Sequence, residues 1–182
     1  MMTESAPSDT PPGTPPEAAG YDRAAVRGER LKERIYASLT LLAVLVGLAQ
    51  GGHSTHTGAA VAVAATALGL WMATLVADMQ AHPVVHGSRP TLHEVRHELF
   101  TSSPLLTSAI GPLLLIALSA LGAVGLTTAL WIAAGSEVAT LALWGFVGGR
   151  RAGAGVLHAT VTSALNAAIG LGVVSVKLLA GH

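Results

Sequence analysis

The chain contains no cysteine, and only 4% of its 182 residues are aromatic and 11% charged. Without cysteine it can form no disulfide, no thiolate metal site and no cysteine nucleophile. A soluble domain has about a quarter of its residues charged, whereas eleven of the twenty Asp, Glu, Lys and Arg residues here lie in the first 34 positions. The rest of the chain has too little charge for a water-facing surface, which excludes a soluble enzyme. The net charge of zero predicts no nucleic-acid partner.

Long apolar runs are present instead, since 51% of the residues are apolar and the mean hydropathy is +0.58. Unpaired backbone groups are too costly in lipid and these runs lack the alternation of strands, so each run is expected to be a helix. The sequence predicts an all-α integral membrane protein, with a five-helix transmembrane domain over 35–182 and the lipid bilayer as its surroundings. Five stretches approach the roughly 20 residues that cross a bilayer, at about 35–50, 58–81, 104–124, 127–149 and 155–179.

The amino-terminal part is predicted to lie outside the bilayer. Residues 1–20 are rich in Pro, Ser and Thr with almost nothing apolar to bury, which indicates a disordered tail. Residues 21–34 (YDRAAVRGERLKER) are expected to form a charged juxtamembrane helix. The tail has no basic region ahead of a short apolar core, so the first hydrophobic helix is expected to direct insertion, not a signal peptide.

The basic residues predict the orientation. With the amino end in the cytoplasm, nine of the ten Lys and Arg residues fall on the cytoplasmic side, and Lys177 alone falls outside. Cytoplasmic loops of membrane proteins carry the excess of such residues. The chain is therefore predicted to be a multi-pass protein of the inner (cell) membrane, with a cytoplasmic amino end and an external carboxyl end.

Small residues predict close helix contacts. Gly145 and Gly149 form a GxxxG pair, and Ala164, Ala168 and Gly172 recur every four residues on the last stretch. Small residues at this spacing let helix backbones approach closely. The pattern is compatible with packing inside one protomer and with a homo-oligomer, for which we expect a dimer.

Glu137 lies near the middle of the 127–149 stretch, where an acidic charge costs about 2.5 to 3.5 kcal/mol. Such a carboxyl is expected to be protonated, paired or hydrated. Counted from a turn near Ala152, Asn166 on the next helix reaches a similar depth. We therefore expect Glu137 and Asn166 to form a central site on an ion path, or to join the two helices as a purely structural contact.

Further polar groups are expected at the same level. Ser136 and Thr140 supply hydroxyls beside the acid, and Pro112 leaves the carbonyl of Ser108 without its helical donor. These groups together predict a polar pocket in the membrane.

Asp78 and His158 form a second pair matched in depth, nearer the cytoplasm. A carboxylate and an imidazole at one level indicate either a structural ion pair or the inner step of a cation or proton path.

The connection after the second stretch is rich in histidine. Residues 91–98 (TLHEVRHE) are predicted to form a short cytoplasmic amphipathic helix capped at Thr91. Two interpretations place a metal here. His93, Glu94, His97 and Glu98 can collect a divalent metal ion as a possible cofactor or cargo, and His93-Glu94-Val95-Arg96-His97 matches the HExxH pattern of zinc hydrolases. The third interpretation is a solvated connector that binds no metal.

The arrangement resembles the vacuolar iron transporter family over about residues 33–182. The shared features are an inside amino end, five spans, an acidic and histidine-bearing segment after the second span, a tight third-to-fourth connection and a glycine-rich last helix. The resemblance implies metal transport. In that family an aspartate in the first span and methionine and glutamate in the second line the metal path. Met72 and Asp78 are approximate counterparts, and the first span, ERIYASLTLLAVLVGLA, has no aspartate.

The sequence thus leaves three functional hypotheses. The first is a non-enzymatic membrane protein that binds or transports a cation, expected to be divalent, at Glu137 and Asn166, with Asp78 and His158 as the inner step. The second is a non-catalytic helper or structural subunit of a larger membrane complex. The third is a membrane zinc hydrolase.

Overall fold

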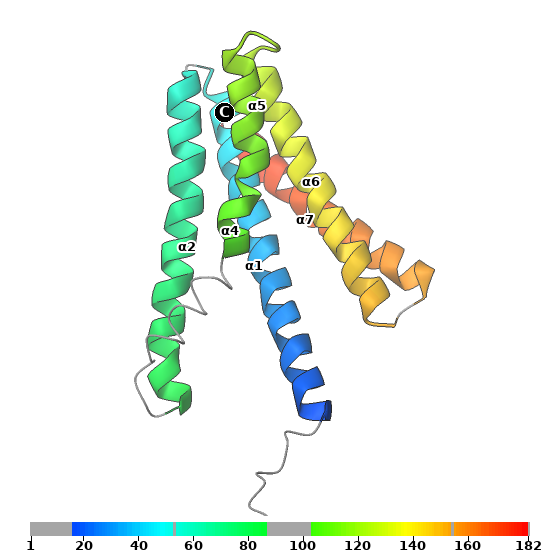
Figure 1. Ribbon diagram of the computed structural model, residues 1–182. Helices are drawn as coiled ribbons and strands as arrows, with labels where there is room; N and C mark the ends of the chain where they lie inside the picture. Colours follow the sequence, from blue (N-terminus) through cyan, green and yellow to red (C-terminus); the bar gives the residue numbers. More distant parts are fainter. Residues whose placement is uncertain (1–15, 53, 87–102, 154, 182) are drawn as a thin grey trace, which may run out of the picture.

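The computed structural model describes residues 16–52, 54–86, 103–153 and 155–181, which form helices and no strand (Figure 1). The predicted all-α class is confirmed for these residues. Figure 1 shows α1 between α2 on one side and the α6–α7 pair on the other. The helices are α1 (Pro16–Gln50), α2 (His56–His86), α4 (Ser103–Ser108), α5 (Ile110–Ala120), α6 (Leu126–Arg151) and α7 (Val156–Ala180).

Successive long helices run in opposite directions. The α1–α2 connection, the α5–α6 connection and the end of α7 lie at one end of the bundle, and the α6–α7 turn lies at the other (Figure 1). The end of α7 reaches α1, since a Cβ added to Gly181 would lie 2.9 Å from Oε1 of Gln50. Gly122 and Gly153, in the two tight turns, have φ values of +84° and +77°, which glycine adopts without strain.

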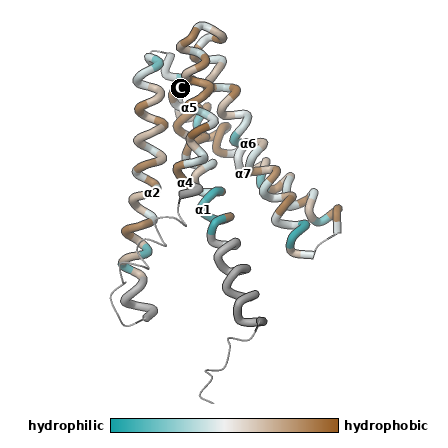
Figure 2. Tube along the Cα trace, in the orientation of Figure 1, coloured by the Kyte–Doolittle hydropathy of each residue, from teal (hydrophilic) through white to brown (hydrophobic). Residues whose placement is uncertain are grey.

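Three of the described helices are long and apolar enough to cross a membrane: His56–Ala81 within α2, and the whole of α6 and α7. Only 6% of the apolar window of α7 is buried. Leu157, Leu165 and Leu179 are each at least 60% exposed, and Figure 2 shows the brown, hydrophobic colour over most of α2 and α5. Apolar helices whose outer faces carry leucine and valine are typical of a membrane protein.

Two helix boundaries differ from the sequence prediction. α1 begins at Pro16 and continues without a break through the charged segment, so residues 16–20 of the predicted tail are helical. The predicted 104–124 stretch is divided into α4 and α5 at Ala109. Pro112 explains the division, because it has no N–H to donate to the carbonyl of Ser108. The rest of the predicted tail and the predicted amphipathic helix lie outside the described residues.

α1 forms the centre of the apolar core. It contacts α2, α4, α6 and α7. Leu41, Leu42, Leu45 and Val46 are each no more than 1% exposed, so consecutive turns of the helix are covered. The facing stripe on α6 consists mainly of alanine and leucine, namely Ala129, Leu130, Ala133, Ala134 and Leu141.

α6 and α7 pack at very short range through glycine. A Cβ added to Gly149 would lie 2.7 Å from Cα of Ala159, and one added to Gly145 would lie 2.8 Å from the carbonyl oxygen of Thr162. The GxxxG pair therefore joins two helices of the same protomer. Ala164, Ala168 and Gly172 are exposed, and the dimer stays a prediction.

Gly149→Ala is expected to lower the free energy of unfolding by about 1–3 kcal/mol, because the methyl group has no space between α6 and α7. The measurement is denaturant unfolding of the purified protein in detergent. Gly135→Ala on the same helix is the control, since nothing lies within 4 Å of its added Cβ. This control gains the same helix propensity as Gly149→Ala and should not lower the free energy of unfolding. Equal stability of the two variants would contradict the close contact.

Candidate functional site

Glu137 is a buried acid of α6 at the interface with α1. Its side chain is 5% exposed and stands on the α6 stripe that otherwise carries small or apolar residues. The hydroxyl of Ser38 on α1, itself 2% exposed, hydrogen bonds to this carboxyl group. The second oxygen, Oε2, has no hydrogen-bond partner among the described residues. The carboxyl group therefore retains acceptor capacity inside the bundle.

A cavity of about 340 Å³ adjoins Glu137, and we call it the Glu137 cavity. It lies among α1, α4, α5 and α6. Its volume falls in the lower part of the range of small-ligand sites, about 300–1,000 Å³. The cavity opens to the surface of the bundle, since Thr107, Gly111 and Ser136 are exposed. Its lining consists of Arg34, Ser38, Thr107, Ser108, Gly111, Pro112, Ser136, Glu137, Thr140 and Trp144.

Three of the lining hydroxyls donate within their own helices. Ser136 Oγ donates to the carbonyl of Ala133 at 2.7 Å, Thr140 Oγ1 to that of Ser136 at 2.8 Å and Ser108 Oγ to that of Leu105 at 2.6 Å. A hydroxyl oxygen keeps lone pairs after it has donated its proton. These groups can therefore act only as acceptors toward the cavity, which makes its wall rich in electron-donating oxygens.

Arg34 and Trp144 form one side of the cavity. The guanidinium carbon of Arg34 lies 5.0 Å from the centre of the Trp144 ring, a cation–π distance. A Cβ on Gly148 would lie 3.4 Å from Cδ2 of Leu31, so the charged part of α1 runs beside the last turns of α6. The predicted boundary between a juxtamembrane 21–34 segment and a span from 35 stays a prediction. Arg34 lies beside the apolar part of α6.

Asn166 forms its described hydrogen bond with the backbone of α6, not with the Glu137 carboxyl group. Its Nδ2 donates to the carbonyl of Leu141 at 3.4 Å, and Ser163 on the same helix donates to the carbonyl of Ala142 at 2.7 Å. Asn166 is not among the residues that line the Glu137 cavity. The expected contact between its amide and the Glu137 carboxyl is not found among the described hydrogen bonds.

Asp78 and His158 are not brought together. Asp78 is on α2, which packs against α1, α4 and α5, whereas His158 is exposed on α7, which packs against α6 and α1. Figure 1 shows α2 and α7 on opposite sides of the bundle. Equal predicted depth did not imply contact, because other helices stand between the two.

His93, Glu94, His97 and Glu98 lie outside the described residues, so both the metal patch and the zinc-hydrolase hypothesis stay predictions. Within the part of the chain that the structure describes, no group of three or more His, Cys, Asp or Glu side chains could hold a metal ion. The site that can be described is thus built from one carboxyl group and hydroxyl oxygens.

Ser38 and Arg34 carry little signal in the sequence. Ser38 is one hydroxyl in an apolar run, and Arg34 is one of several charges in the segment before it. Their place in the site depends on the register between α1 and α6, which a single sequence does not contain. The sequence indicated only that the Glu137 carboxyl group needs a polar partner from another helix.

Comparisons with protein-family models, with curated proteins and with solved structures find no match to the chain. The resemblance to vacuolar iron transporters therefore stays a prediction.

Ser38→Ala is expected to lower the free energy of unfolding by about 1–3 kcal/mol, because the buried carboxyl group loses its hydrogen-bond donor. Ser136→Ala is the control, since that hydroxyl donates only to the backbone of its own helix in the described structure. It should change the free energy by less than about 0.5 kcal/mol. The measurement is unfolding in detergent followed by circular dichroism. An equal loss in both variants would show that Ser38 does not support Glu137.

Proposed function

We propose that this chain is a membrane protein that binds a small cation at the Glu137 cavity and moves it across the bilayer. The observation that carries the proposal is the buried Glu137 carboxyl group, which lines a cavity with several hydroxyl oxygens and has one oxygen without a partner among the described residues. Ionisable groups inside a membrane are costly and are found mainly where ions or protons pass.

The chemistry of the cavity favours a hard, singly charged cation. Carboxylate, hydroxyl and carbonyl oxygens suit H⁺, Na⁺ and similar ions, whereas transition metals favour imidazole or thiolate ligands. The cavity has a single carboxyl group among its lining residues, and the positive charge of Arg34 is also on its wall. One negative charge beside one positive charge stabilises a divalent ion poorly, since repulsion grows with the charge of the ion.

A five-span topology accommodates the cavity. In addition to the three helices named above, α1 and the α4–α5 pair would each cross the bilayer, the latter through its apolar Leu105–Ala120 portion. Arg150 and Arg151 lie in the last turn of α6, next to the α6–α7 turn. The excess of basic residues at that end supports a cytoplasmic location for it and for the Arg34 side of the cavity.

The orientation can be tested with single cysteines, because the natural chain has none. Ala123→Cys in the α5–α6 turn is expected to react with an impermeant maleimide in intact cells. Ala152→Cys in the α6–α7 turn is expected to react only after the membrane is opened. Both residues are exposed, so access differs only by the side of the membrane. Labelling of Ala152→Cys in intact cells would reverse the orientation.

Glu137→Gln is expected to lower cation flux by about tenfold or more, since an interaction with a charged group contributes about 1.5 kcal/mol or more. The assay is flux into proteoliposomes, run separately with H⁺, Na⁺, Fe²⁺, Mn²⁺ and Zn²⁺. Gln keeps the size of the side chain and its ability to accept from Ser38, so the variant should fold. Glu137→Asp should retain part of the flux, because it keeps the carboxyl group.

Two outcomes would contradict the proposal. One is the absence of flux for every ion with folded wild-type protein, and the other is equal flux for wild type and Glu137→Gln. Fe²⁺ flux without H⁺ or Na⁺ flux would support the iron transport that the family resemblance implies, and would overturn the preference for a singly charged ion.

A structural role is the second candidate, and the Ser38–Glu137 hydrogen bond favours it. This contact links α1 to α6 and could be kept by glutamine, whose carbonyl oxygen also accepts. A helper subunit of this kind predicts that Glu137→Gln supports full function in cells and transports nothing in liposomes.

A further inference from the structure

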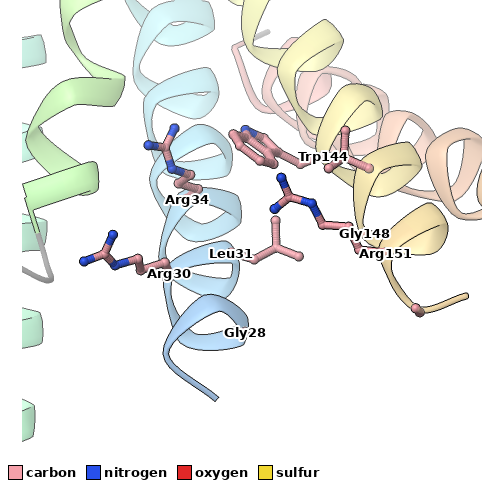
Figure 3. Close-up of a pocket in the computed structure, with 9 residues that line it drawn as sticks. Gly28, Arg30, Leu31, Arg34, Trp144, Gly148 and Arg151 are labelled. Atoms are coloured by element: carbon pink, nitrogen blue, oxygen red, sulfur yellow. The ribbon is translucent and has the colours of Figure 1, made fainter. Parts of the chain in front are cut away.

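A second and larger cavity, of about 660 Å³, lies between the amino-terminal half of α1 and the last turns of α6. We call it the arginine cavity. Figure 3 shows Leu31, Trp144 and Arg151 pointing into the space between the two helices, with Arg30 on the flank of α1. Its lining comprises Gly28, Arg30, Leu31, Arg34, Trp144, Val147, Gly148, Arg151 and Ala152.

The charge of this cavity is of one sign. Three of the nine lining residues are arginine and none is acidic. Arg34 has the aromatic ring of Trp144 as its described partner, and Nε of Arg30 is buried without a hydrogen-bond partner among the described residues. Positive charges that line one cavity repel one another, so an anion that binds among them lowers this repulsion.

The chemistry of the lining suits a phosphate group. Arg34 and Arg151 come from different helices, and their guanidinium groups each offer a planar fork of N–H donors. Such forks bind phosphate oxygens through paired, charge-assisted hydrogen bonds. A single carboxylate would satisfy fewer of these donors than a phosphate, which has more oxygens and a larger charge.

The place of the cavity suits the end of a bilayer. It adjoins the turn after α6, where Arg150 and Arg151 end the apolar helix. The lining residues Leu31, Val147 and Trp144 are apolar or aromatic, and tryptophan is common at the level of lipid headgroups. Basic pockets between membrane helices can bind the headgroups of anionic lipids.

We propose that the arginine cavity binds a phosphate group, presented by an anionic phospholipid or by a soluble phosphate compound. The arginine cavity is a different site from the Glu137 cavity, although Arg34 and Trp144 line both. Arg151 lines the arginine cavity alone, and it provides the variant that separates the two proposals.

The test uses the full-length protein in detergent and native mass spectrometry. Phosphatidylglycerol, phosphatidylcholine, inorganic phosphate and glycerol 3-phosphate are added separately. Wild type is expected to retain phosphatidylglycerol in preference to phosphatidylcholine, and Arg151→Gln to reduce this retention about fivefold, the effect of one arginine near a charged surface. The double variant Arg34→Gln with Arg151→Gln is expected to lose the preference.

Arg150→Gln is the matched control, because Arg150 is the neighbouring exposed arginine and does not line the cavity. Retention of the lipid that soluble phosphates cannot displace would identify a lipid headgroup as the ligand. Specific binding of glycerol 3-phosphate or inorganic phosphate would identify a soluble one. Equal losses in Arg150→Gln and Arg151→Gln, or no retention of any phosphate by wild type, would overturn the proposal. Circular dichroism of each variant establishes that it is folded.

Discussion

The hydrogen bond between Ser38 and Glu137 is the contact on which the polar interior depends. A carboxyl group enclosed by apolar helices loses its water, and each oxygen left without a donor costs free energy. Ser38 supplies one donor from α1 and so fixes which turn of α1 faces which turn of α6. The leucines that follow Ser38 on α1 then cover the alanine stripe of α6. The Glu137 cavity remains where the lining residues carry hydroxyl groups in place of apolar side chains.

Two departures from a regular helix shape the surroundings of this contact. Pro112 interrupts the third apolar stretch and takes away the donor of the Ser108 carbonyl, both on the cavity wall. On the other face of α6, Gly145 and Gly149 bring α7 so close that Asn166 and Ser163 reach carbonyl groups of α6 itself. Asn166 and Ser163 are therefore used in helix–helix packing, and the cavity is left to α1, α4, α5 and α6.

The sequence predicted the helices well and their contacts only in part. Hydropathy located five apolar stretches, and each corresponds to a helix or, at Pro112, to a pair of helices. The grouping of Glu137 with Ser136, Thr140, Ser108 and Pro112 followed from depth in the membrane, and the structure places these residues around one cavity. Depth does not say which helices are neighbours, however. It therefore paired Glu137 with Asn166 and Asp78 with His158, and it gave no sign of Ser38, which comes from the helix on the other side of α6.

Arg34 and Trp144 connect the two proposed sites electrostatically. Their side chains line both cavities, so the charge of Arg34 acts on an ion near Glu137 as well as on an anion beside Arg151. An anion bound in the arginine cavity would offset part of that charge, and a cation approaching Glu137 from this end would then meet a smaller repulsion. The interaction is reciprocal: a bound cation contributes the same free energy to anion binding as a bound anion contributes to cation binding. Arg151, which lines one cavity, and Ser136, which lines the other, are the residues through which each site can be altered without changing the shared wall.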